Sequence, residues 1–175
     1  MKNDLQMQVA LGREELNKNG AKKNKYLIFD LAEEKYGIPL FSVKEVIGLV
    51  SIVSVPHVPP FFKGIINLRG KIISVIDLRL KLSLPSGQYL PKKTCIIITE
   101  IDGFTLGVVV DDVIEVANYD TAQIENNLDI QSKIAKEFIT GVAKKDKGLT
   151  LLLNIGQTLN IDELKLLKEQ PTSAS

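Results

Sequence analysis

The side chains that most often carry catalysis or bind metal ions are scarce in this sequence. Cys95 is the only cysteine, His57 is the only histidine, and there is no tryptophan. One histidine and one cysteine do not supply the ligands of a zinc site. Any other metal ion would have to be bound by carboxylates alone. There is also no P-loop and no Gly-x-Gly-x-x-Gly motif. We therefore predict no catalytic residue, no metal and no cofactor.

Asp77, Asp111 and Asp112 are the carboxylates considered for acid–base chemistry. They do not form a convincing pair, because Asp112 is better placed to cap a helix. An enzyme with carboxylates in a cleft would still lack a nucleophile–base pair, which disfavours that function. Cys95 precedes three isoleucines and is expected to be a buried small hydrophobe. His57 lies in a Pro-rich connection and is expected in a surface loop.

The strongest binding candidate is the segment Gly64-Ile65-Ile66-Asn67-Leu68-Arg69-Gly70. Asn67 and Arg69 alternate with apolar residues, so both are expected on the water-facing side of a strand. Arginine is favoured at interfaces because its planar guanidinium binds carboxylates through two hydrogen bonds. The alternative is a loop arginine that pairs with Asp77 or Glu45 for local order. The sequence leaves both open.

Glu45 also has two interpretations. Ser42-Val43-Lys44-Glu45 has the N-cap and N3 residues of a one-turn helix, and Asp112 to Glu115 repeats the pattern. For Glu115 we expect only a capping role at the helix N-terminus. For Glu45, capping and contact with a partner protein are equally compatible with the sequence.

Short β-strands joined by tight turns are the elements that would position these residues. Asp102-Gly103 is the strongest hairpin signal, and Arg69-Gly70 is a second tight turn. The strands are expected at Tyr26–Leu31, Lys35–Leu40, Ile65–Leu68, Lys71–Leu78, Lys93–Ile101, Phe104–Val110, Phe138–Ala143 and Thr150–Ile155.

The two halves of the chain repeat one unit. Gly37–Val46 aligns without a gap on Gly107–Val116, and Gly64–Leu78 overlays Gly141–Ile155 with equal spacing. Each copy is too short and too rich in strands to bury its apolar faces alone. We therefore expect two small antiparallel barrels that share one core. The overlay leaves open which barrel contains the first strand.

The ends of the chain differ from its body. Residues 1–25 are polar, with six Lys/Arg against three Asp/Glu, and are predicted to be a flexible tail; a short strand over Leu5–Leu11 is the alternative. A capping box at Asn160 predicts a helix at about 161–168, and 169–175 are expected to be disordered. No signal-peptide or membrane segment is present, which favours the cytoplasm.

Several motifs together resemble one known family. They are Tyr26–Phe29, Tyr36–Ile38, Val43–Val46, Pro56 with Pro59, Lys63–Gly70, Val75–Arg79 and Val110–Val116. With this set, roughly residues 25–168 resemble the CheW family, and the Asn-Leu-Arg-Gly and Ile-Asp-Leu-Arg pair is its most specific part. The resemblance implies a mostly β domain over 26–168, with two SH3-like five-stranded barrels around a shared core. The first repeat would span about 26–85 and the second about 90–157.

The resemblance also implies a non-enzymatic adaptor. A CheW-like protein binds the cytoplasmic tips of chemoreceptors (methyl-accepting chemotaxis proteins) and the regulatory domain of the CheA histidine kinase, and transmits receptor state to kinase activity. It would be cytoplasmic and recruited to membrane-associated receptor arrays. Matching motif positions assign to functional surfaces, chiefly receptor-facing ones, Val43, Glu45, Gly64, Asn67, Arg69 and Gly70.

The sequence departs from the family pattern at two positions. Ser74 stands where proline is frequent, and Asn154 stands where aspartate is common. The alternative function is that of a small-barrel nucleic-acid-binding protein. It would need a basic groove with aromatic side chains, and the near-neutral body of this chain disfavours it.

Overall fold

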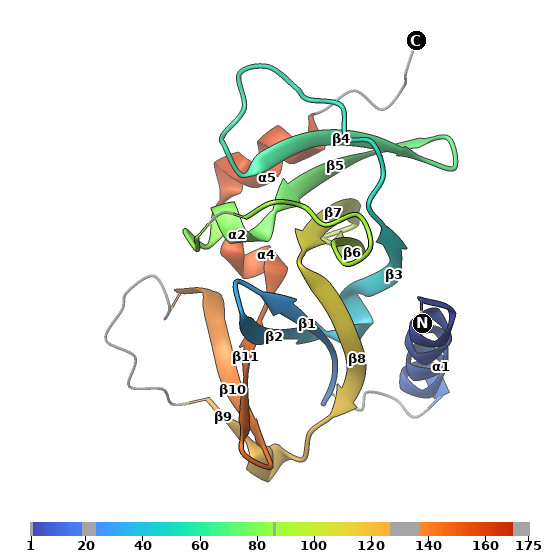
Figure 1. Ribbon diagram of the computed structural model, residues 1–175, viewed down its shortest axis with the longest axis vertical. Helices are drawn as coiled ribbons and strands as arrows, with labels where there is room; N and C mark the ends of the chain where they lie inside the picture. Colours follow the sequence, from blue (N-terminus) through green and yellow to red (C-terminus); the bar gives the residue numbers. More distant parts are fainter. Residues whose placement is uncertain (1, 19–23, 86, 127–136, 170–175) are drawn as a thin grey trace.

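Two β-sheets form most of the protein, whose computed structural model describes residues 2–18, 24–85, 87–126 and 137–169 (Figure 1). The strands are β1 (Lys25–Leu31), β2 (Glu34–Pro39), β3 (Val43–Gly48), β4 (Phe62–Leu68), β5 (Lys71–Asp77), β6 (Cys95–Ile101), β7 (Phe104–Val110), β8 (Asp112–Asn118), β9 (Ile124–Glu125), β10 (Ile139–Lys145) and β11 (Gly148–Leu153). The helices are α1 (Lys2–Lys18), η1 (Leu40–Ser42), α2 (Leu78–Lys81), η2 (Thr121–Gln123), α4 (Ile155–Thr158) and α5 (Ile161–Lys168).

Each repeat contributes its first two strands to the sheet of the other repeat. The five-stranded sheet has the order β3-β6-β7-β5-β4, and the six-stranded sheet has the order β8-β1-β2-β11-β10-β9. Each exchanged hairpin pairs with its host strands on both sides. The pairing is antiparallel at β6 beside β3 and β1 beside β8, and parallel at β7 beside β5 and β2 beside β11. These two parallel pairs are the one departure from the predicted antiparallel pairing.

The duplication extends to the irregularities of the sheets. The pairing of β4 with β5 shifts register between Phe62 and Gly64, and that of β10 with β11 shifts between Ile139 and Gly141. The overlay places these four residues at equivalent positions. A β-bulge inserts one extra residue and bends its strand, so both repeats bend at the same point. The prediction of a mostly β fold built from a repeated unit is confirmed.

One apolar core lies between the two sheets. Its largest fully buried side chains are Leu27, Phe29, Leu31, Ile38, Leu40, Ile76, Leu78, Ile97 and Leu106. Full burial of one such side chain contributes roughly 1.5–3 kcal/mol to the free energy of folding. Since the hairpins are exchanged, this core combines side chains from both repeats.

The predicted flexible tail over residues 1–25 is wrong for residues 2–18, which form α1. Leu5 and Val9 on this helix are only 8% and 2% exposed and belong to the main core. They are four residues apart, so they lie on one face of a helix. The helix therefore has an apolar face, although the overall composition of the segment is polar.

The alternative of a short strand over Leu5–Leu11 is also wrong. Met7 and Leu11 suggested alternation, but in α1 they lie on the face away from the core and are 63% and 53% exposed. Alternation over seven residues is therefore a poor guide here, because the same residues also fit two faces of one helix.

The predicted C-terminal helix is confirmed as α5, which packs Leu167 into the main core. Its capping box is formed as expected: Asn160 Oδ1 accepts from Glu163 N at 2.8 Å, and Glu163 Oε1 accepts from Asn160 N at 3.0 Å. The predicted disorder of 169–175 lies almost wholly outside the described residues. Of the described helices, none combines the length and the apolar character needed to cross a bilayer.

We predict that valine at Gly37 or at Gly107 destabilises the protein to a similar extent, by about 1–3 kcal/mol, because each site is closely packed. A Cβ on Gly37 would lie 3.0 Å from the side chain of Ile28, and one on Gly107 would lie 3.0 Å from that of Ile96. Thermal melting of the two variants measures the loss of stability at each site. Gly148→Val is the control, since a Cβ there meets only a backbone oxygen at 3.6 Å. Free tolerance of valine at one site alone would contradict the structural equivalence of the repeats.

Candidate functional site

The turn between β4 and β5 carries three of the six predicted interface residues. Arg69 and Gly70 form its tip with φ angles of 50° and 85°. Asn67 Oδ1 accepts a hydrogen bond from Gly70 N at 2.9 Å. An asparagine side chain that accepts a hydrogen bond from a backbone N–H of the turn in this way fixes the backbone conformation of the turn residues. Asn67 therefore positions Arg69 as well as being exposed itself.

An ion pair connects this turn to the far end of the same sheet. Arg69 Nη2 donates to Glu45 Oε1 on β3, although β3 and β4 are the two end strands of the five-stranded sheet. A backbone bridge also ties Val53, in the connection between β3 and β4, to Ile65 of β4, with hydrogen bonds of 2.9 Å in both directions. The sheet therefore curls until its ends approach each other.

The local alternative for Arg69 is realised with Glu45 and not with Asp77. The Arg69 side chain is 69% exposed and that of Glu45 is 26% exposed, so the pair lies at the surface. Exposed ion pairs contribute about 0–1 kcal/mol to stability. The pairing therefore leaves the guanidinium accessible and does not exclude a partner contact.

The second repeat lacks this pair. The overlay places Glu115 and Asp146 where the first repeat has Glu45 and Arg69. Asp146 occupies the same kind of turn position, with a φ of 55° against 50° for Arg69. Two carboxylates repel each other, so the pairing belongs to one repeat only. The repeated fold does not require it.

Gly64 and Val43 have structural roles beneath this surface. A Cβ on Gly64 would lie 2.0 Å from Val53 O, and its φ of +145° belongs to glycine. Val43 is fully buried at the start of β3. The structure thus gathers Glu45, Asn67, Arg69 and Gly70 where the two end strands of the sheet approach each other. Gly64 lies at the bulge of β4, and Val43 lies in the core.

The predicted one-turn helices after Ser42 and Asp112 are wrong. Val43 begins β3, and Asp112 is the first residue of β8. Ser42 Oγ instead donates to Pro39 O at 2.8 Å within η1, the short turn that precedes β3. Sheet pairing overrides the local capping pattern here. Glu45 is therefore not a capping residue, and its side chain pairs with Arg69 instead.

Sequence reasoning missed the cluster around Asp111. Arg79 Nε donates to Asp111 Oδ1 at 2.8 Å, and Asp111 Oδ2 accepts from Ala32 N at 2.8 Å. The hydrogen bond to Asp111 raises the pKa of Arg79. This cluster ties α2, the β1–β2 turn and the end of β7 together. The motifs Val75–Arg79 and Val110–Val116 contained these residues without showing that they pair.

Asp77 also has a structural role. Its Oδ1 accepts from Leu80 N at 3.3 Å at the start of α2, and its Oδ2 accepts from the Tyr89 hydroxyl. Burial, followed by this hydrogen bond, raises the pKa of Tyr89. In the described part of the chain, no group of three or more His, Cys, Asp or Glu side chains is arranged to hold a metal ion.

The candidate site is thus an exposed charged turn on a frame of two interlocked β repeats. A sequence model of the CheW-like domain matches residues 25–163, so the chain belongs to the CheW-like domain family. It is similar to the chemotaxis protein CheW of Klebsiella aerogenes, with 32% identity over 142 residues that cover 81% of this chain and 85% of that protein. For CheW of Treponema pallidum the identity is 28% over 145 residues, with 79% and 84% covered.

A solved relative supports the same assignment. The crystal structure of the scaffolding protein TtCheW from Thermoanaerobacter tengcongensis superimposes with a TM-score of 0.73 at 38% identity, covering 81% of this chain and 95% of that one. Family membership assigns the chain to the chemotaxis coupling and scaffolding proteins. The family match begins at residue 25, after α1.

We predict that alanine is far more costly at Gly64 than at Gly70. At Gly64 the new Cβ would overlap Val53 O, which requires the Val53–Ile65 bridge to open, whereas no atom lies within 4 Å of a Cβ on Gly70. Gly70→Ala should cost about 1 kcal/mol for its left-handed backbone, and Gly64→Ala at least about 2–3 kcal/mol. Chemical denaturation measures both. Equal losses of stability in the two variants would contradict the close approach of Gly64 to Val53 O in β4.

Proposed function

We propose that the protein is a non-enzymatic adaptor that couples chemoreceptors to the CheA histidine kinase and transmits receptor state to kinase activity. The observation that carries this proposal is the exposed Glu45–Arg69 pair at the curled end of one sheet, in a chain of the CheW-like family. Its partners would be the cytoplasmic tips of the receptors and the regulatory domain of the kinase. It would act in the cytoplasm at membrane-associated receptor arrays.

The chemistry of Arg69 suits such a contact. Its guanidinium carries five N–H donors, and Glu45 accepts from Nη2. The remaining donors can bind a carboxylate or a carbonyl group on a partner. A charged hydrogen bond buried on binding counts for far more than the same bond in water. The hydrogen bond from Gly70 N to Asn67 Oδ1 fixes the turn backbone that carries Arg69, which lowers the entropy cost of ordering this segment on binding.

We predict that Arg69→Ala separates binding from folding. Stability should change by no more than about 0.5 kcal/mol, because truncation of an exposed side chain opens no cavity. Loss of a partner contact desolvated on binding should weaken the complex by about 2–5 kcal/mol. Circular-dichroism melting and receptor-stimulated kinase activity in reconstituted complexes measure the two effects. Lys71→Ala, two residues away and also exposed, is the matched control.

The opposite pattern would contradict this prediction. A variant that unfolds, or that couples receptor to kinase as well as the unaltered chain does, would leave Arg69 as a structural residue only. Loss of activity in Lys71→Ala to the same extent would show that net positive charge matters and not the position of the guanidinium.

We also predict that exchanging the two charges does not restore coupling. The double variant Glu45→Arg with Arg69→Glu keeps an ion pair between β3 and the β4–β5 turn, but it reverses the charges that a partner would meet at the two positions. If the pair only shaped the sheet, the exchange would restore activity that each single reversal removes. Kinase activation measured for the two single variants and the double variant distinguishes these cases. Full recovery in the double variant would contradict a direct contact by Arg69.

A further inference from the structure

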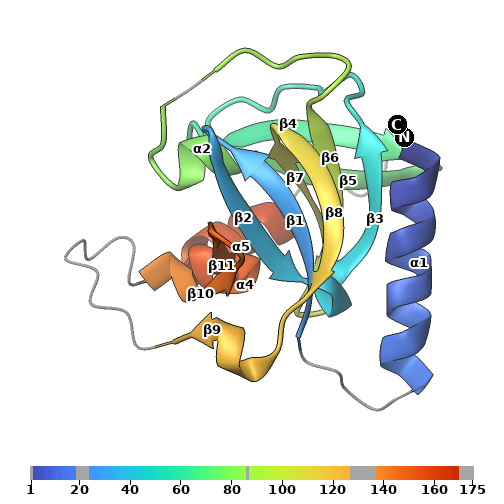
Figure 2. The same cartoon turned by 60° about the horizontal axis from the view of Figure 1, so that its bottom comes forward.

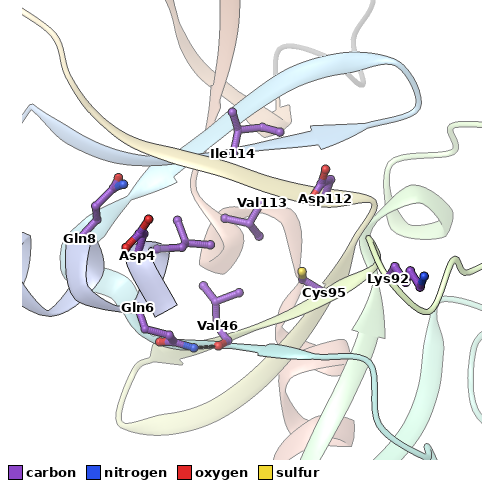
Figure 3. Close-up of a pocket in the computed structure, with 10 residues that line it drawn as sticks. Asp4, Gln6, Gln8, Val46, Lys92, Cys95, Asp112, Val113 and Ile114 are labelled. Atoms are coloured by element: carbon purple, nitrogen blue, oxygen red, sulfur yellow. Dashed lines mark hydrogen bonds between the residues drawn. The ribbon is translucent and has the colours of Figure 1, made fainter. Parts of the chain in front are cut away.

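The first and the last of the described helices are attached to the sheets in different ways. α1 covers β3 and β8, the end strands of the two sheets (Figure 2). A pocket of about 370 Å³ remains beside it, and in Figure 3 Val46 and Val113 project into this space from the two strands. α5 follows β11 and α4 of the second repeat, but it lies beside β5 of the first repeat (Figure 1). α5 therefore joins the two repeats.

An ion pair with little exposure to water fixes the start of α5. Lys81 Nζ, on α2 of the first repeat, donates to both carboxylate oxygens of Glu163, at 2.9 and 2.7 Å. The two side chains are only 14% and 12% exposed. Charges shielded from water attract each other more strongly, and removal of one partner leaves the other buried without compensation. The pair therefore resists separation of α5 from α2.

The ammonium group of Lys81 also lies over two aromatic rings. Its Nζ is 4.8 Å from the ring centroid of Phe61 and 6.0 Å from that of Phe138. Phe61 precedes β4 in the first repeat, and Phe138 precedes β10 in the second. The face of an aromatic ring attracts a cation, and more strongly where water is excluded. Lys81 thus gathers groups from both repeats around the first turn of α5.

A buried hydrogen bond fixes the other end of α5. Ser74 Oγ in β5 donates to Leu167 O at 3.1 Å. The carbonyl groups in the last turn of a helix have no partner within the helix, so a donor from outside satisfies one of them here. Leu167 itself packs into the main core. Residues of the first repeat therefore hold α5 at its first turn and at its last turn.

Both attachments belong to the segment that follows the Arg69 turn. β5 begins at Lys71, two residues after Arg69, and Ser74 lies within this strand. α2, which carries Lys81, follows directly after β5 ends at Asp77. The strand that leads away from the candidate site is thus tied to a helix of the second repeat.

The second repeat has no equivalent of this tie. The overlay of the repeats places Leu151 where the first repeat has Ser74, and its continuation places Thr158 where the first repeat has Lys81. Leu151 has no side-chain donor, and Thr158 Oγ1 donates locally to Ile155 O at 2.7 Å. The repeated fold therefore does not require the attachments of α5.

We propose that α5 is a latch that fixes the strand after the Arg69 turn to the second repeat, and that Ser74, Lys81 and Glu163 are positioning residues for transmission of receptor state to the kinase. The inference rests on the proposed function. An adaptor that joins two partners at once needs two surfaces, and only one of them includes Arg69. A change at one surface reaches the other through rigid elements and the contacts between them. The latch makes the Arg69 turn and the second repeat move as one body.

The first experiment measures hydrogen exchange of the α5 amides in the full chain. Glu163→Gln keeps a side-chain oxygen for Asn160 N but leaves Lys81 without a charged partner. Exchange in α5 should become about tenfold faster or more, because local opening of the helix becomes easier. Lys81→Met with Glu163→Gln removes both charges and should exchange more slowly than Glu163→Gln alone. Ser74→Ala should also accelerate exchange, and it is the milder variant if Glu163→Gln fails to fold.

Two variants serve as matched controls. Asp162→Asn removes a negative charge from the same turn of α5, but Asp162 is exposed. Thr140→Val removes a hydroxyl group that donates to Leu152 O at 3.2 Å within the second repeat. Neither should accelerate exchange in α5 as Glu163→Gln and Ser74→Ala do. Equal acceleration in the controls, or unchanged exchange in the two latch variants, would overturn the latch.

The second experiment compares binding with transmission in reconstituted complexes. Glu163→Gln and Ser74→Ala should bind a chemoreceptor cytoplasmic fragment and the kinase within about twofold of the unaltered chain, because neither residue lies at the Arg69 turn. Receptor-stimulated kinase activity should nevertheless fall about fivefold or more, because the adaptor no longer moves as one body.

The outcomes of the second experiment separate positioning from a merely structural role. Full stimulation by variants whose α5 amides exchange faster would overturn the positioning role. A parallel loss of binding and stimulation would overturn it as well, because the substitutions would then damage the binding surfaces themselves. If the unaltered chain binds neither partner, the proposed function fails, and the exchange rates still decide whether these residues latch α5.

Discussion

The exchange of hairpins between the two repeats is the constraint on which the rest of the structure depends. The hairpin of β1 and β2 completes the sheet of the second repeat, and that of β6 and β7 completes the sheet of the first. Neither sheet can bury its apolar face with strands of one repeat alone. The shared core, and the contacts of Asp111 with Arg79 and Ala32, follow from this interlocking.

The interlocked frame also brings together the residues of the exposed ion pair. Glu45 and Arg69 belong to opposite ends of one sheet and meet only because that sheet curls. The bulge at Gly64 and the bridge between Val53 and Ile65 hold the curl in place. A site on rigid elements loses little conformational entropy when a partner binds. Because the pair is exposed, it contributes little to stability, and the proposed binding surface is largely separate from the folding core.

Helix α1 covers the end strands β3 and β8 of the two sheets. β3 carries Glu45 at the protein surface and offers the carbonyl groups of Val43 and Val46 to α1. Exposed strand ends need cover, and a helix with glutamine and arginine side chains provides it without adding a strand. The covering helix and the Glu45–Arg69 pair therefore share one strand.

The sequence by itself determined the features that depend on neighbouring residues. The hairpin turn at Asp102-Gly103, the capping box of α5 and the two aligned repeats all follow from local turn chemistry, capping and spacing. Only the tertiary structure decided which repeat each hairpin joins, that Glu45 pairs with Arg69 and not with a helix terminus, and that residues 2–18 dock as a helix. These outcomes depend on contacts between residues far apart in the chain, where packing overrides local preference.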